Sequence, residues 1–244
     1  MLLRKANVVE GALELLDAEG LDGLTMRKLG AALNVQAGAL YRHFPSKEAL
    51  LDAMAEKLIE GVGEPLPEGS WDEQLTALAH RFRAALLAHR DGARLVAGTF
   101  VPEPNTNAAG SAAVAVLCAA GVPAERAGWI TFAAMYYVLG HTIEEQAQLR
   151  LEEQGEDWQA RQAHAPDVDP LFARALGAVI AADPAERFAY GLELFIDGVR
   201  QQLLGGQQRT RRPSSTPAPA GPRSSAGGSS ARPARRRGGG RPAR

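Results

Sequence analysis

The chain has 244 residues, of which 45% are hydrophobic and 23% are charged, and its formal net charge is −1. This length suits one large or two small domains, and the composition is typical of a soluble globular protein. The longest apolar run, Ala113–Ala120, is far shorter than the ~20 residues that a membrane helix needs, which excludes an integral membrane protein.

Two features bear on the compartment. The first residues lead directly into charged amphipathic sequence, so we expect no signal peptide and a cytoplasmic protein. The single cysteine, Cys118, cannot form an internal disulfide or a cysteine metal cluster. Its apolar helical surroundings predict a buried, inert thiol.

The first sixty residues predict a compact helical unit. Thr25 and Ser46 are plausible N-caps, and Asn34 can adopt the left-handed conformation that ends a helix. Phe44-Pro45 breaks the helical pattern, because proline disfavours a helical conformation in the residue before it. The predicted helices are Leu3–Glu19, Met26–Leu33 and Ala37–His43, followed by one that starts after Ser46.

Helical spacing resumes beyond a Gly/Pro linker at 61–70 and continues to residue 204. No convincing period-2 strand is found, so the predicted fold class is all-α. We expect three parts: a domain over 1–60, a larger helical domain over 61–204, and a disordered tail over 205–244. The predicted helices of the larger domain are Trp71–His89, Asp91–Gly98, Thr106–Ala120, Pro123–Leu149, Pro170–Ala181 and Pro184–Leu204, with a loop over Glu152–Asp169.

Charge is unevenly distributed along the chain. The stretch Thr25–Lys47 contains four basic residues and no acidic one, and the Arg/Pro/Ser/Gly-rich tail contains ten arginines and no acidic one. A local basic stretch in an otherwise acidic protein points to nucleic acid. The tail either adds sequence-independent phosphate contacts, or probes a minor groove, or is a solvated extension without a role.

The basic stretch coincides with a helix-turn-helix candidate at Thr25–Phe44. Leu29, Leu33 and Leu40 are expected to face inward, with Val35 sealing the turn. The alternative is a plain antiparallel helix pair on a protein surface. In a helix-turn-helix, the third helix and the residues that flank it contact duplex DNA. The candidate DNA-binding residues are Thr25, Arg27, Gln36, Ala37, Gly38, Ala39, Tyr41, Arg42, His43 and Lys47.

Two runs, Leu24–Gly30 and Gly38–Leu51, resemble the DNA-binding domain of the TetR family of bacterial transcriptional regulators. The resemblance covers about residues 3–204. In the larger domain it is similar to the tetracycline-repressor subclass, over Trp71, Phe82–Leu87, Arg90–Arg94, Gly98-Thr99, Leu139-Gly140 and Ile143–Gln146.

The resemblance implies an N-terminal three-helix helix-turn-helix DNA-binding domain and a helical C-terminal ligand-binding and dimerisation domain. It also implies a homodimer, paired as a four-helix bundle through 123–149 and 184–204. The apolar face of the second of these helices carries Phe188, Leu192, Phe195 and Val199. Such a protein is a repressor that binds a palindromic operator and is released by a small-molecule inducer. The alternatives are a transcriptional activator of this fold and an all-helical small-molecule-binding protein.

The recognition helix departs from the tetracycline repressors. Ala37, Gly38 and Ala39 stand where those proteins have polar residues, which predicts a different operator. An alanine methyl can meet a thymine methyl but cannot donate a hydrogen bond. Arg42 is the best candidate for a guanine contact, and the alternative is a contact to phosphate only.

The ligand pocket departs as well. The two histidines that help to hold drug-bound Mg²⁺ in tetracycline repressors correspond to Val62 or Gly63 and to Val96. Valine offers no metal ligand, so we expect an apolar or aromatic inducer and neither a metal site nor a cofactor. Met135 either lines the pocket or belongs to the core. The candidate ligand-binding residues are Leu78, Phe82, Val96, Thr99, Met135 and Glu144.

One further polar cluster is visible in the sequence. His141, Glu144 and Glu145 share a helical face at i, i+3 and i+4, which suits a metal, an acid–base pair, a polar pocket rim or a dimer seam. No Gly-x-Ser-x-Gly, P-loop, His-Glu-x-x-His or Cys-x-x-Cys motif is present. The sequence therefore predicts a regulator and not an enzyme, with no membrane partner.

Overall fold

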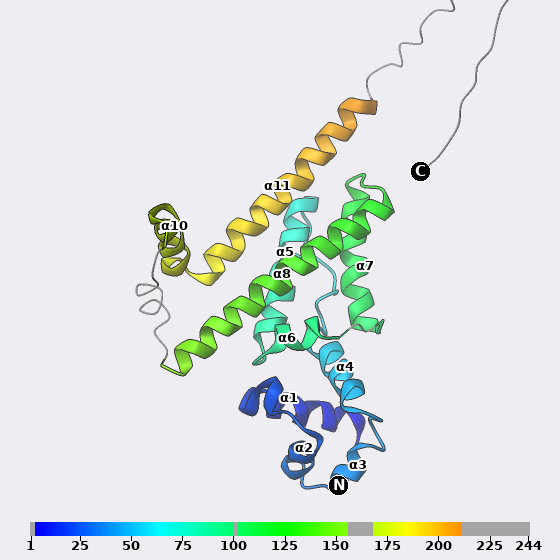
Figure 1. Ribbon diagram of the computed structural model, residues 1–244. Coiled ribbons are helices and arrows are strands. Elements are labelled where there is room, and N and C mark those ends of the chain that lie inside the picture. The colour runs from blue at the N-terminus through cyan, green and yellow to red at the C-terminus, as the bar shows by residue number, and fades with distance from the viewer. Residues whose placement is uncertain (1–2, 100–101, 156–167, 211–244) are drawn as a thin grey trace, which may run out of the picture.

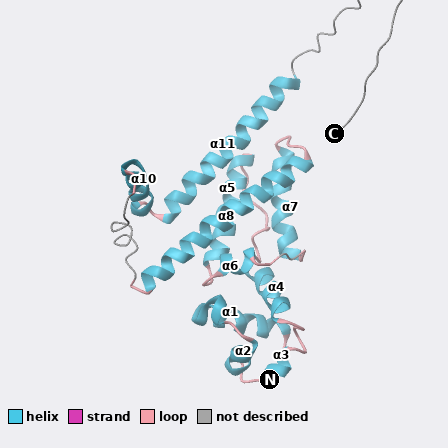
Figure 2. Cartoon of the chain, in the orientation of Figure 1, coloured by secondary structure: helices cyan, strands magenta, loops and turns pink. Residues whose placement is uncertain are grey.

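The computed structural model describes residues 3–99, 102–155 and 168–210, with side chains to residue 203 (Figure 1). All regular structure in these ranges is helical, which confirms the all-α prediction (Figure 2). The helices are α1 (Lys5–Gly23), α2 (Met26–Ala32), α3 (Ala37–Leu40), α4 (Lys47–Leu58), α5 (Trp71–Leu87), α6 (Gly92–Ala97), α7 (Pro104–Ala119), α8 (Ala124–Glu153), α10 (Pro170–Ala181) and α11 (Pro184–Thr210).

Helices α1, α2 and α3 form a small cluster at one end of the molecule (Figure 1). Their core is aliphatic, and Val8, Leu16, Leu29 and Leu40 are all fully buried in it. Helix α4 leads from this cluster toward the rest of the protein, where it contacts α6 and α7. Along the chain, α2 and α3 are therefore connected to the larger region through one short helix.

The long helix α8 organises the larger region. It packs against α5, α6 and α7 on one side, and α11 lies across it and α5. Helix α10 has no buried residue among those described. No helix in the described part of the chain combines the length and the apolar character that crossing a membrane requires.

Several predicted boundaries shift. Gly20, with φ 73°, is non-helical and interrupts α1 where the sequence predicts a stop, and a further short helical stretch continues to Gly23. Helix α3 is only four residues long, and residues 41–43 form turns. Helix α11 continues to Thr210, so the tail predicted from residue 205 begins in a helix, and 211–244 lie outside the described residues. Residues 156–167 of the predicted loop also lie outside them.

The prediction for Cys118 is wrong, because this residue is exposed. Helix α7 turns Ala113, Val116 and Leu117 into the core, and Cys118 follows on the outer face. A helix made almost entirely of apolar residues still has one face toward solvent. The sequence alone did not show which residues lie on that face.

Candidate nucleic-acid interface and effector region

The turn between α2 and α3 is built from local contacts. Asn34 is left-handed, with φ 53°, as its position predicted. The Val35 N–H donates to the Gly30 carbonyl at 2.8 Å. A Cβ at Gly30 would lie only 2.9 Å from the Val35 oxygen, so the absence of a side chain lets the two helices approach closely.

Side-chain caps fix the two helices that flank α3. The Thr25 hydroxyl accepts the Lys28 N–H at 3.2 Å, and the Ser46 hydroxyl accepts the Ala49 N–H at 3.2 Å. Both predicted N-caps are therefore confirmed. Below the turn, Leu40 is fully buried, while Leu33 and Val35 are half-buried and pack against the same core.

This framework leaves one surface of the turn open to solvent. Tyr41 is 50% exposed, and no atom lies within 4 Å of the place where a Cβ of Gly38 would stand. Among the candidate DNA-binding residues, the exposed ones are Thr25, Arg27, Gln36, Gly38, Tyr41 and Arg42, and the half-buried ones are Ala37, Ala39, His43 and Lys47.

The cations on this surface differ in their partners. Lys28 pairs with Glu19 at 2.7 Å, so its charge is compensated within the protein. Arg27, Arg42 and Lys47 form no ion pair within the ranges 3–99, 102–155 and 168–203. Three cations beside exposed polar side chains make a surface suited to a polyanion.

The structure brings most of the candidate ligand-binding residues onto neighbouring helices. Leu78 and Phe82 lie on α5, Val96 on α6 and Met135 on α8, and all four belong to or pack against the central core. Thr99 follows α6 and is half-buried. Glu144 is exposed, so it lies apart from the apolar group.

The position of Gly63 is sterically closed. A Cβ there would lie 2.5 Å from the backbone carbon of Ala108 in α7, which leaves no room for an imidazole. Val62 beside it is buried. The described residues contain no group of three or more His, Cys, Asp or Glu side chains placed to hold a metal ion.

The polar cluster on α8 has a structural role that the sequence only partly indicated. Glu145 is buried and pairs with Arg83 of α5, whose Nε donates to its carboxylate at 2.9 Å. His141 Nδ1 lies 3.7 Å from the same carboxylate, while Glu144 is exposed and takes no part. Of the three residues, His141 and Glu145 therefore form the cluster.

Phe188 of α11 inserts into this cluster and is fully buried. Tyr137 stacks on its ring at 5.6 Å, and the Tyr137 hydroxyl donates to the Phe188 carbonyl at 2.7 Å. The rings of His80 and His141 meet it edge-on at 5.1 and 5.2 Å. Burial lowers the pKa of both histidines, so the neutral imidazoles suit this site.

The apolar face of α11 is therefore used differently from the expectation. Phe188, Leu192 and Val199 are buried within the protomer, and Phe195 packs against its core, so they are not free for a second subunit. The exposed large apolar residues of α8 and α11 are instead Trp129, Phe132, Tyr136, Leu149, Tyr190 and Leu194. Periodicity shows that a face is apolar but not what covers it.

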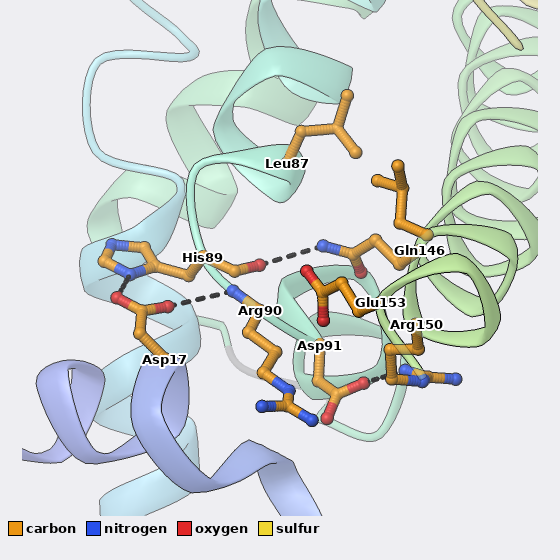
Figure 3. A pocket seen from close by; sticks show the side chains of 9 residues that line it. Asp17, Leu87, His89, Arg90, Asp91, Gln146, Arg150 and Glu153 are labelled. Carbon is orange, nitrogen blue, oxygen red and sulfur yellow. Dashed lines mark hydrogen bonds and ion pairs between the residues drawn. The ribbon is translucent and has the colours of Figure 1, made fainter. Parts of the chain in front are cut away.

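A polar junction that sequence reasoning missed joins α1 to the larger region (Figure 3). Asp17 accepts the backbone N–H of Arg90 at 2.9 Å and meets His89 Nδ1 at 2.9 Å. Asp91 is buried and left-handed, and it accepts the Leu21 N–H at 2.9 Å and pairs with Arg150 of α8. A cavity of about 250 Å³ lies at this junction, and none of the candidate ligand-binding residues lines it.

Comparison with known proteins follows the same two parts of the chain. Residues 8–54 match the family model described as bacterial regulatory proteins, tetR family, and residues 64–203 match the tetracyclin repressor-like C-terminal domain. The class C tetracycline repressor of Escherichia coli is 38% identical over 206 residues, which cover 83% of this chain and 93% of that protein.

Two solved structures are similar over the same extent. A variant of TetR from Acinetobacter baumannii AYE, in complex with minocycline, is 35% identical with a TM-score of 0.65, over 82% of this chain and 98% of that one. BioQ with its double-stranded DNA operator is 29% identical with a TM-score of 0.62, over 81% and 98%.

Proposed function

Since the chain belongs to the TetR family of bacterial regulatory proteins, we propose that it is a ligand-responsive transcriptional repressor. A dimer binds a palindromic DNA operator, and a small-molecule inducer releases it. The observation that carries this proposal is the open surface of α3 and of the turn after it. Tyr41 and Arg42 are exposed there, beside cations without an ion-pair partner in the described residues. We further propose that it acts in the cytoplasm, where bacterial DNA lies, as a regulator and not as an enzyme.

The candidate DNA-binding residues divide by the part of the duplex that they reach. Arg42 suits the O6 and N7 acceptors of guanine in the major groove. Arg27 and Lys47 flank α3 and suit backbone phosphates, while Tyr41 and His43 can donate hydrogen bonds to phosphate oxygens. The small residues at 37–39 allow α3 to approach the base edges closely.

Dimerisation uses the outward apolar residues of α8 and α11. Trp129 is 80% exposed in the protomer and Tyr190 is 66% exposed, which is a large apolar surface to leave in water. Pairing these two helices with their copies in a second subunit buries that surface. A two-fold dimer then presents two α3 helices one DNA turn apart, roughly 34 Å.

The inducer is apolar or aromatic. Val96 and the closed position at Gly63 offer no ligand for a hard cation, whereas Leu78, Phe82 and Met135 offer apolar contacts. Its effect depends on binding one conformation of the dimer better than the other, which supplies roughly 1–3 kcal/mol of coupling.

Selection from a pool of randomised duplexes, followed by footprinting, tests the DNA-binding proposal. We expect an inverted repeat, and we expect Arg42→Ala combined with Tyr41→Ala to weaken operator binding by at least roughly tenfold. Lys28→Ala is the matched control, because Lys28 already pairs with Glu19. Unchanged operator occupancy in the double variant contradicts the proposed interface.

A gel shift tests the inducer class. It compares minocycline with Mg²⁺ against apolar aromatic compounds, and we expect the apolar aromatic compounds to release the protein from the operator.

A further inference from the structure

The carboxylate of Glu56, in α4, lies at the N-terminus of α7. It accepts the Asn105 N–H at 2.6 Å and both the N–H and the hydroxyl of Thr106 at 3.1 Å. In return, the Asn105 side-chain amide donates to the Glu56 carbonyl at 3.1 Å. Four hydrogen bonds thus join one turn of α4 to the first turn of α7, 49 positions away in the sequence.

This contact replaces a cap that α7 lacks. Its own N-cap residue, Glu103, makes no side-chain hydrogen bond to the helix start. The first backbone N–H groups of a helix have no partner within the helix, and a carboxylate there also interacts favourably with the helix dipole. Glu56 therefore caps α7 from a different helix, and the two helices are fixed to each other.

Helix α4 carries this constraint to the recognition segment. It begins directly after the Ser46 cap, and Phe44, which ends the α3 turn, is anchored in the core. A rigid helix of twelve residues thus has one end at α3 and the other at α7. Any change in the α4–α7 angle changes where α3 lies relative to the larger region.

We propose that Glu56 is a positioning residue for the recognition helices: it sets the angle of α4 against α7 and thereby the half-site spacing that the dimer accepts. This inference rests on the proposed function, since it requires an operator with two half-sites. The capped start of α7 comes shortly after Thr99, a candidate ligand contact. A shift of this start away from α4 breaks the bonds from Asn105 and Thr106 to Glu56, while α4 keeps its contacts with α1 and α6.

The test uses the full-length protein and duplexes that carry the selected half-site as inverted repeats with spacers of different lengths. Wild-type protein is expected to prefer one spacer length. Glu56→Ala is expected to bind that duplex roughly tenfold more weakly and to bind neighbouring spacers almost equally well, with the half-site sequence unchanged. A residue that only stabilises the fold lowers affinity equally for all spacers.

Glu60→Ala is the matched control, because Glu60 lies just beyond α4, is exposed and pairs only with Lys57 among the described residues. Its spacer preference is expected to match that of the wild type. Circular dichroism checks folding. If Glu56→Ala does not fold, Glu56→Gln is tested in its place. Glutamine has the size of glutamate but places an amide N–H₂ group against the α7 donors. Its spacer preference is expected to be weaker than that of the wild type but not lost.

Two outcomes overturn the inference, and they are distinguishable. A wild-type spacer profile in the folded Glu56 variant refutes the positioning role and leaves the proposed function standing. If wild-type protein selects no inverted repeat at all, the proposed function fails, and the positioning role fails with it.

Discussion

At the scale of single residues, the recognition turn depends on two positions where the backbone tolerates few side chains. Asn34 is left-handed, which asparagine accepts more readily than most residues. Gly30 is helical but lies against the Val35 carbonyl. Glycine is needed there because a side chain has no room, and not because φ is unusual. The geometry of α3 therefore depends on the lack of a Cβ atom at Gly30.

Gly30→Ala is expected to destabilise the protein by about 1–3 kcal/mol, because the backbone of the turn must move to admit the methyl group. Operator affinity should fall as well, since α3 is displaced. Urea unfolding measures the first effect and gel shift the second. Gly38→Ala is the control: space is open there, so we expect stability to be unchanged or slightly higher. Equal effects of the two substitutions on stability would contradict this interpretation of Gly30.

At the scale of elements, two polar or aromatic contacts far apart along α11 add to its buried aliphatic side chains in attaching it to the protomer. Phe188 enters the cluster formed by Arg83, Tyr137 and the two histidines, and Arg200 pairs with Asp72 of α5 at 2.6 Å. These contacts fix which face of α11 points inward. They thereby decide which apolar residues stay outside for a second subunit.

The attachment of α11 should depend on pH through Asp72. The neighbouring Ser70 hydroxyl and the Arg200 guanidinium lower the pKa of Asp72 to about 2. Because this pKa lies below the unfolded value of 3.8, the stabilisation is present above pH 4 and is lost as the pH falls toward 2.

We expect Asp72→Asn to be less stable than wild type at pH 5 by at most about 1 kcal/mol, since Arg200 is well solvated. The difference should shrink below pH 4 and disappear only below pH 2. Urea unfolding at several pH values measures it, and Glu193→Gln, on the exposed side of α11, serves as the control. A difference that grows on acidification would refute the assignment.

At the scale of the whole molecule, the end of α11 and the recognition surface lie apart. The C-terminal end of α11 lies at the opposite end of the molecule from α2 and α3 (Figure 1). The arginines beyond α11 are thus attached far from the recognition surface.

Removal of residues 211–244 deletes nine arginines. If they contact phosphates, operator affinity falls and the slope of log affinity against log salt becomes shallower by about 0.9 per lost contact. Half-site preference should stay the same. Gel shifts at several salt concentrations measure the slope, and a variant with these arginines changed to glutamine separates charge from length. An unchanged slope would leave this segment without a DNA-binding role.

Much of the candidate DNA interface could be predicted from the sequence because its determinants are local. A cap such as Thr25 or Ser46 acts within three residues, and a left-handed Asn34 is a property of one residue. The candidate ligand-binding residues were placed by resemblance, and their role stays a prediction. The junction at Asp91 was missed because its partners come from α1 and α8, which no local pattern connects.

The sequence by itself determined the all-α fold, most helix positions and the basic turn, because periodicity, caps and charge depend only on residues close together in the sequence. Only the tertiary structure decided that Cys118 lies outside, that Phe188 faces its own protomer and that Glu56 caps α7. The physical reason is that an amphipathic helix specifies an apolar face, whereas the partner of that face depends on how all the helices fill the core together.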